Sequence, residues 1–428
     1  MRTYKTFSLK DTSVFKAQVL QWSQAFEEII WLDSNAYNDQ INYEAILAVD
    51  AFTALKTDTQ QAFEKLEEYQ STTKDYLFGY LTYDLKEDTE NLKSNNFDGL
   101  DFPDLYFFQP KKIIRIMGNS AEFLYLNMVD DEMETDFVHI CSLEINPPTH
   151  KKTTALKARF SSEEYIEKVQ QMKAHIQRGD IYEANFCQEF YLENQEINPL
   201  QSYLKLNTIS KAPFAAFLRL EDHYALSASP ERYIKKQGNK VISQPIKGTA
   251  KRLEEPKEDE KLKENLKNDP KEVAENVMIV DLVRNDLSKT AFRGSVNVEE
   301  LCGLYSFKQV HQLISTVSSQ LREDVTPVEV LQTTFPMGSM TGAPKISAMK
   351  IIEELETTKR GLYSGSIGYF TPEGDFDFSV IIRTILYNAT KKYTSCSVGS
   401  AITIQSIPEN EYEECLVKVK ALKKAISV

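Results

Sequence analysis

One lysine in the middle of the chain has the clearest chemical potential. Lys247 follows the apolar pair Val241 and Ile242 by a few residues and directly precedes Gly248. A glycine beside the amine leaves room for a ligand to approach it closely, and a lysine shielded from water can lose its proton and act as a nucleophile. The charged run 251–271 looks like a solvated surface, so the alternative is a strand-end lysine that points into water.

Glu275 is a candidate metal ligand at the start of a helix. Asp269 followed by Pro270 is typical of a helix N-terminus, and Glu272 stands where a glutamate often bonds back to the cap. Glu272 is therefore interpreted as a capping residue. Glu275 lies one turn later on the same face and has no such role.

The last helix of the chain supplies two more carboxylates. Apolar residues recur at helical spacing over 410–426, and Glu411 and Glu414 lie one turn apart on another side. One interpretation pairs Glu414 with Lys418 at i,i+4 as surface support. The other brings Glu414 together with Glu275, because carboxylates from two helices plus an anionic ligand suit Mg²⁺, which takes few protein oxygens and keeps its waters.

Glu231 is the candidate general acid. It follows a strand-like segment and Pro230, which fixes the turn. A carboxyl group held there can donate a proton if burial raises its pKa. The alternative is an ion pair with the neighbouring Arg232.

Several features could bind an anion. The glycine-rich segment 338–345 enters a helix, and free backbone N–H groups at a helix start attract anions; its Gly-Ala-Pro-Lys order does not match a nucleotide P-loop. Arg383 ends an apolar strand, where a guanidinium generally meets a carboxylate of the protein or of a ligand. Tyr363 and His311 stay open between two roles, binding a ligand or serving as satisfied polar groups of the core.

Composition excludes several classes of protein. The chain has 428 residues and a formal net charge of -13, which argues against nucleic acid or an anionic membrane as partner. Its five cysteines are scattered without a CxxC pair, which suits reduced thiols and offers no zinc site. No hydrophobic signal region opens the sequence and no apolar run reaches membrane-spanning length. We therefore expect a soluble, cytoplasmic protein.

Hydrophobic patterns divide the chain into two predicted parts. Residues 1–145 mix a helical pattern at 14–30 with strand-like segments at 77–83 and 112–117. A polar stretch with two prolines at 147–148, running to about Ser161, predicts a linker. Residues 160–428 form the second part.

Consecutive strands dominate the second part. Helical spacing begins near Tyr165 and is stopped by Gly179. The short turns between later strand-like segments indicate antiparallel sheets covered by the interspersed helices, an α+β architecture. The predicted strands are 181–190, 214–220, 224–226, 241–243, 367–370, 376–387 and 393–398.

Taken together, these segments resemble the chorismate-binding enzymes, a family that includes the first components of anthranilate synthase and aminodeoxychorismate synthase as well as isochorismate and salicylate synthases. The match runs from about Tyr165 to the C-terminus, and more loosely through 78–84. Its ordered motifs are GDIY (179–182), SPER (229–232), PIKGT (245–249), MIVDLVRNDL (278–287), TGAPK (341–345), YSGSIG (363–368) and EYEE (411–414).

The resemblance implies two large antiparallel β-sheets packed as a sandwich with flanking helices, and a cleft that holds chorismate and Mg²⁺. By position, Glu275 and Glu414 would hold the metal with Glu411 close by, and Glu231 would protonate the departing 4-hydroxyl group. The implied substrate-binding residues are Gly248, Thr249, His311, Thr341, Tyr363, Arg383 and Gly399.

The residue at position 247 separates activities within the family. Anthranilate synthases usually carry alanine there, whereas Lys247 implies covalent amination. The lysine would attack ring C2 of chorismate while the C4 hydroxyl leaves, and ammonia would then attack C4 and expel the lysine. The product, 4-amino-4-deoxychorismate, leads to 4-aminobenzoate and folate. Covalent catalysis divides one hard substitution into two easier ones.

Two departures and one absence complete the comparison with the family. Glu183 stands where hydroxylating relatives use a water-activating lysine and most amine-transferring relatives a glutamine, which speaks against isochorismate or salicylate synthase. Ala401 replaces a usual glycine. Because no glutaminase signature is present, ammonia is expected from a separate glutamine amidotransferase subunit. One alternative is anthranilate synthase component I. The other is a non-catalytic binding protein of the same fold, and the retained carboxylates Glu231 and Glu275 argue against this second alternative.

Overall fold

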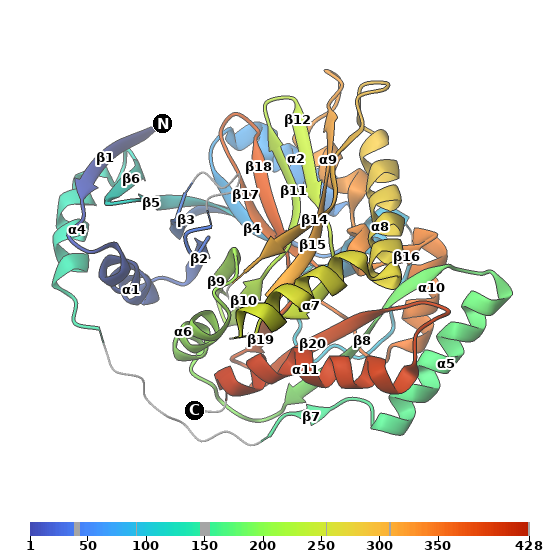
Figure 1. Ribbon diagram of the computed structural model, residues 1–428. Helices are drawn as coiled ribbons and strands as arrows, with labels where there is room; N and C mark the ends of the chain where they lie inside the picture. The colour runs from blue at the N-terminus through green and yellow to red at the C-terminus, as the bar shows by residue number, and fades with distance from the viewer. Residues whose placement is uncertain (38–42, 91, 146–154, 254, 308–309, 427–428) are drawn as a thin grey trace.

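A computed structural model of the chain describes residues 1–37, 43–90, 92–145, 155–253, 255–307 and 310–426. Helices and long antiparallel strands are combined throughout, as Figure 1 shows, so the predicted α+β class is confirmed. Among the described residues, the structure contains no helix that is both long enough and apolar enough to cross a membrane.

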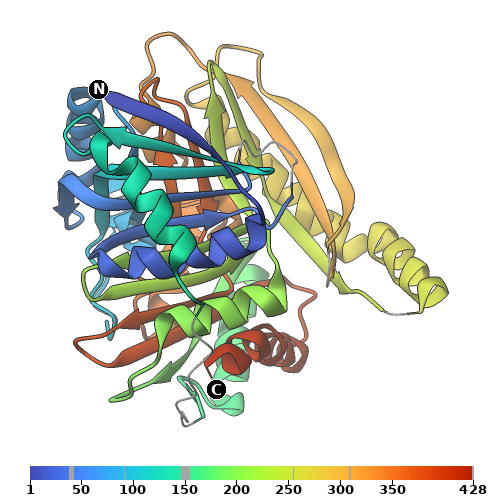
Figure 2. The same cartoon turned by 90° about the vertical axis from the view of Figure 1, so that its left-hand side faces the viewer.

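The first part of the chain is mainly sheet, with helices α1 and α4 packed against each other over its outer face (Figure 2). Its elements in chain order are β1 (Arg2–Ser8), α1 (Thr12–Trp22), β2 (Glu28–Asp33), β3 (Ala45–Thr57), α2 (Ala62–Thr73), β4 (Leu77–Leu81), α3 (Lys86–Glu90), β5 (Leu105–Met117), β6 (Ser120–Leu126) and α4 (Met133–Ser142).

The rest of the chain adds most of the strands and the helices that flank the site. Its elements are β7 (Lys157–Ala158), α5 (Ser162–Arg178), β8 (Glu183–Leu192), α6 (Pro199–Ser210), β9 (Phe214–Leu220), β10 (His223–Ser229), β11 (Arg232–Gln237), β12 (Lys240–Gln244), β13 (Ile246–Lys251), α7 (Pro256–Asn268), α8 (Pro270–Ser288), β14 (Asn297–Ser306), β15 (Val310–Gln320), α9 (Pro327–Thr334), β16 (Gly342–Ala343), α10 (Lys345–Leu355), β17 (Ser366–Phe370), β18 (Phe376–Val380), β19 (Thr384–Asn388), β20 (Tyr393–Ile402) and α11 (Pro408–Ile426).

The strands form two antiparallel limbs that share the long strands β3 and β5. One limb continues from β3 through β2, β9, β10, β19 and β20 to β8. The other continues from β5 through β4, β17, β18, β11 and β12 to β15, which also pairs with β13 and β14. The pairs β2–β9 and β4–β17 join the two predicted parts. The division at 145–160 stays a prediction, and residues 146–154 of its linker lie outside the described residues.

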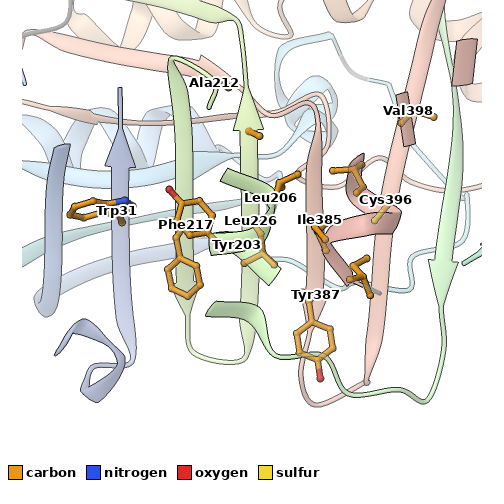
Figure 3. Packing of buried hydrophobic residues seen from close by; sticks show 14 of the residues in the cluster. Trp31, Tyr203, Leu206, Ala212, Phe217, Leu226, Ile385, Tyr387, Cys396 and Val398 are labelled. Atoms are coloured by element: carbon orange, nitrogen blue, oxygen red, sulfur yellow. The ribbon is translucent and has the colours of Figure 1, made fainter. Parts of the chain in front are cut away.

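Large apolar side chains fill the space between the sheets and their helices. In Figure 3, Tyr203 and Leu206 of α6 pack against Phe217 of β9 and Leu226 of β10, and all four side chains are at most 1% exposed. Burial of such side chains stabilises a fold by about 1.5–3 kcal/mol each. This packing fixes the limb that ends in β8.

Most predicted elements are present with shifted bounds, and two predictions differ more strongly from the structure. Helix α5 begins with a capping box at Ser161 and ends at Gly179, whose φ of 85° is one that glycine adopts readily. The helix predicted over 14–30 is too long, because α1 ends at Trp22 and β2 begins at Glu28. The single strand predicted over 376–387 is wrong, because β18 and β19 are separate strands with Arg383 between them at φ 53°.

Helix α8 begins as predicted, but its cap differs in one detail. The carboxylate of Asp269 accepts hydrogen bonds from the backbone N–H groups of Lys271 (2.9 Å) and Glu272 (3.3 Å). The N–H of Asp269 bonds instead to the carbonyl of Leu266 at the end of α7 (3.4 Å). The capping role predicted for Glu272 is therefore wrong, because the N–H group it would accept from already has a partner.

The cap of α8 gives a first prediction, because this helix holds Glu275 in place. Asp269→Ala removes an acceptor for two N–H groups and should lower the free energy of unfolding by about 1 kcal/mol. Asp269→Asn keeps a side-chain oxygen and should lose much less. Urea unfolding of both variants checks this, and equal losses would contradict it.

Candidate active site

Lys247 lies on β13, inside the angle between the two limbs. Its Nζ donates a hydrogen bond to Oε1 of Glu183 on β8 at 2.8 Å. The two side chains are only 10% and 2% exposed. The register of β13 on β15 is broken between Lys247 and Thr249 by Gly248, which has a φ of 84°. The lysine thus points into the interior rather than into bulk water.

Charges around Lys247 decide its protonation state. Burial alone would lower the pKa of the amine, but the carboxylates of Glu183, Glu275 and Glu231 outweigh burial and raise the pKa above its ordinary value. The resting group at neutral pH is therefore an ammonium ion. The carboxylate of Glu183 lies in direct contact with the amine, and its second oxygen, Oε2, is buried without a hydrogen bond to any described residue.

Glu231 lies in the turn between β10 and β11 and is 4% exposed. Burial raises its pKa to about 7, while a hydrogen bond with Ser339, the charge of Lys247 and the N–H of Ile246 oppose the rise. The alternative ion pair with Arg232 is not formed, because that guanidinium binds both carboxylate oxygens of Asp377 at 2.9 and 3.1 Å. A carboxyl group with a pKa near 7 can both donate and accept a proton at neutral pH.

The carboxylates predicted to bind a metal come from α8 and α11. The Nζ of Lys271 is 3.7 Å from Oε1 of Glu275 and 3.7 Å from Oε1 of Glu411. Burial raises the pKa of Glu275 to about 7, with Lys247 opposing it. Glu414 pairs with Lys418 at 2.5 Å, which is the surface pair weighed from the sequence.

These carboxylates have the chemistry of a site for a hard divalent cation. Burial would raise the pKa of Glu414, but Lys418, Lys271 and Arg383 together lower it, so that it is ionised. Oε1 of Glu275 is buried without a hydrogen bond to a described residue, which leaves it available to a ligand. The donor set therefore fits Mg²⁺, although no cluster of three or more potential metal ligands is preassembled among the described residues.

Opposite these carboxylates lie the groups predicted to bind anions. The Arg383 side chain is partly buried, burial lowers its pKa, and it forms no hydrogen bond or ion pair with a described residue. The Tyr363 hydroxyl is buried and lies 3.9 Å from Sγ of Cys187. A Cβ on Gly399 would lie 2.6 Å from that sulfur, so only glycine fits this strand position. An unpaired guanidinium beside these groups suits a carboxylate ligand.

Three other predicted residues are occupied within the protein. The ring of His311 contacts Asp259 at 3.1 Å and Ser306 at 2.7 Å, which corresponds to its alternative role as a satisfied polar group. The Thr249 hydroxyl accepts a hydrogen bond from Gln312 (3.4 Å). Thr341 is buried, and its carbonyl accepts the N–H of Asn185 at 2.7 Å.

The comparisons with known proteins show the family of the chain. The sequence profile described as "chorismate binding enzyme" matches residues 21–424. The chain belongs to the chorismate-binding enzyme family. Among its relatives, aminodeoxychorismate synthase component 1 of Bacillus subtilis is 33% identical over 88% of this chain and 81% of its own length. The Escherichia coli protein of the same name is 42% identical over 64% of this chain and 60% of its own length.

Other similar proteins have a different name, or their similarity shows a shared fold alone. An anthranilate synthase component I-like protein of Synechocystis is 36% identical over 81% of this chain and 72% of its own length. The crystal structure of anthranilate synthase component I from Streptococcus pneumoniae superposes with a TM-score of 0.77 at 26% identity, covering 88% of this chain and 91% of its own. The menaquinone-specific isochorismate synthase MenF of E. coli has a TM-score of 0.78 at 17% identity, covering 100% and 94%.

Sequence reasoning missed two residues of the candidate site. Glu183 was noted only as a departure from the family, yet it is the direct partner of Lys247. Lys271 was not considered. A signal was present, since Lys271 precedes Glu275 by one helical turn and i,i+4 pairs of opposite charge meet on a helix.

Removing the carboxylate at position 183 should make Lys247 more reactive. Glu183→Gln deletes the charge that most strongly favours the ammonium form, and each unit of pKa lost multiplies the neutral fraction about tenfold. Acylation of Lys247 at pH 8, followed by peptide mass spectrometry, should therefore be faster in the variant. Glu189→Gln is the matched control, because Glu189 is buried on the same strand but pairs with Arg159 at 2.7 Å. Equal rates in all three proteins would refute the coupling.

The raised pKa of Glu231 makes stability depend on pH. A carboxyl group whose pKa rises from 4.5 to about 7 on folding stabilises the fold fully below pH 4.5. This contribution, up to about 3 kcal/mol, is lost as the pH rises through 7. Glu231→Gln should lose less stability than the unmodified protein between pH 5 and pH 8.5, as measured by urea unfolding. An identical decline in both would show that Glu231 titrates normally.

Proposed function

We propose that the protein converts chorismate and ammonia into 4-amino-4-deoxychorismate. The observation that supports this most strongly is the buried amine of Lys247, held 2.8 Å from Glu183 in a chorismate-binding fold. Relatives named aminodeoxychorismate synthase in E. coli, B. subtilis and Arabidopsis thaliana are similar to this chain in sequence. The product is the precursor of 4-aminobenzoate for folate synthesis.

In the first half of the reaction, Lys247 is the nucleophile and Glu231 the acid. Glu183 accepts a proton from the ammonium group, and the neutral amine attacks ring C2 as the ring double bonds shift. The C4–oxygen bond breaks, and the hydroxyl leaves as water after Glu231 has protonated it. The pKa of Glu231 near 7 keeps about half of this carboxyl in the acid form at neutral pH.

In the second half, ammonia takes the place of the hydroxyl. Its nitrogen bonds to C4, the double bonds shift back, and the C2–nitrogen bond breaks to release Lys247. The now ionised Glu231 accepts the proton that the new ammonium group gives up, and Glu183 returns a proton to the departing lysine. Each residue ends in the state in which it began.

Binding of the substrate would use both the carboxylates and the groups predicted to bind anions. Glu275 and Glu414, with Glu411 close by, would hold Mg²⁺, which would neutralise the ring carboxylate and anchor it. Arg383, Tyr363 and the backbone around Gly399 would bind the remaining anionic group, since Arg383 has no anionic partner among the described residues. Gly248, Thr249 and Thr341 would line the pocket, and His311 would have to release Asp259 to reach the ligand.

Ammonia would come from a separate glutamine amidotransferase subunit. The word "component" in the relatives' names is in keeping with a two-part enzyme. A cytoplasmic location is proposed as well, and all five cysteines are free thiols in the structure.

Anthranilate synthase is the second candidate, because relatives of that name align over most of the chain. Anthranilate synthase would aminate ring C2 of chorismate and release pyruvate to form an aromatic product. The lysine at 247 favours the first function, since a nucleophile bonded to C2 blocks the carbon that anthranilate synthesis must aminate.

The product decides between the two. Incubated with chorismate, Mg²⁺ and ammonium, the protein should give 4-aminobenzoate only when aminodeoxychorismate lyase is added. Lys247→Ala should lower this rate on the order of 10²-fold or more, whereas Lys263→Ala on the exposed face of α7 should leave it unchanged. Anthranilate fluorescence without the lyase, or full activity of Lys247→Ala, would overturn the proposal.

A further inference from the structure

Lys271 forms ion pairs with two carboxylates of the proposed metal site. Its Nζ lies 3.7 Å from Glu275 on its own helix and 3.7 Å from Glu411 on α11. Within the described part of the chain, no other cationic side chain is within ion-pair distance of either carboxylate. One ammonium group thus links α8 to α11 at the proposed metal site.

The ion pair with Lys271 balances the charge of Glu275 but does not give its carboxylate oxygen a hydrogen bond. The side chain of Glu275 is 9% exposed, and its Oε1 has no hydrogen bond to a described residue. A charge-assisted hydrogen bond would need about 2.7–2.9 Å, which is shorter than the 3.7 Å observed. A buried carboxylate oxygen in this state is costly and can be satisfied by a closer ligand, and Mg²⁺ binds oxygen at about 2.0–2.1 Å.

We propose that Lys271 is a built-in counter-ion of the metal-free protein, which a divalent cation must displace in order to bind at Glu275 and Glu414, with Glu411 close by. The inference rests on the proposed function, which assigns Mg²⁺ to these carboxylates. A cation and an ammonium group cannot share the same oxygens at short range, because they repel each other. The Lys271 side chain is 37% exposed, so it can move into solvent while both helices stay in place.

The lysine consequently sets the metal affinity of the free protein. With Lys271 in place, metal binding must break two ion pairs, and the affinity is lowered. Without it, the carboxylates of Glu275 and Glu411 repel each other across the helix pair, and a divalent cation relieves that repulsion. Without the lysine, the metal-free protein should therefore be less stable, and its affinity for the cation should be higher.

The test is Mg²⁺ binding by isothermal titration calorimetry, without chorismate or ammonia. Lys271→Met keeps the length of the side chain and removes its charge, and it should lower the Kd for Mg²⁺ about tenfold, which corresponds to about 1.4 kcal/mol. Lys263→Met is the matched control, because Lys263 pairs with Glu260 on the surface of α7, and its Kd should be unchanged. An unchanged or higher Kd in Lys271→Met, or no Mg²⁺ binding by any of the proteins, would overturn the inference.

Thermal unfolding gives a second readout if Lys271→Met proves too unstable for calorimetry. Its midpoint without metal should lie below that of the unmodified protein, and added Mg²⁺ should raise it more. An equal Mg²⁺-induced rise in both would refute the counter-ion role. Neither measurement involves the reaction. Anthranilate formation together with tighter metal binding by Lys271→Met would therefore overturn the proposed function alone. Formation of 4-aminobenzoate only with the lyase, together with unchanged metal binding by Lys271→Met, would overturn this inference alone.

Discussion

The buried contact between Lys247 and Glu183 is the constraint on which the rest of the site depends. The lysine belongs to β13 in one limb of the sheet and the glutamate to β8 at the end of the other, so the pair forms only when both limbs have folded and met. Loss of one partner from a buried ion pair typically costs about 3–5 kcal/mol. The long strands β3 and β5 join the two limbs, and α6 packs on one of them (Figure 3), so these elements help to bring the lysine and the glutamate together.

The same contact organises the charges around it. Lys247 is held as an ammonium ion by three carboxylates, and it in turn limits how far burial can raise the pKa values of Glu231 and Glu275. Both carboxyl groups consequently titrate near neutral pH, where an acid and base are most useful. The proposed nucleophile, proton acceptor and proton donor thus belong to one desolvated cluster.

Ordered motifs predicted the family more reliably than local patterns predicted the path of the chain. The short motifs keep each candidate residue at a fixed place relative to its own strand or helix, and for that reason Glu231 and Glu275 could be proposed from the sequence. The strand predicted over 376–387 failed because nothing local signals the left-handed backbone at Arg383, which the neighbouring strands impose. The capping role of Glu272 failed because the competing carbonyl of Leu266 comes from a helix that the pattern had not indicated.

The sequence by itself determined the family and the α+β class and led to the hypothesis for the reactive side chains, since these follow from local patterns and ordered motifs. Only the tertiary structure decided which groups meet. The contact of Lys247 with Glu183 joins residues 64 positions apart, and Lys271 reaches Glu411 on the last helix. Local patterns cannot encode such contacts, because the charge and burial of a side chain depend on strands and helices that lie far away in the sequence.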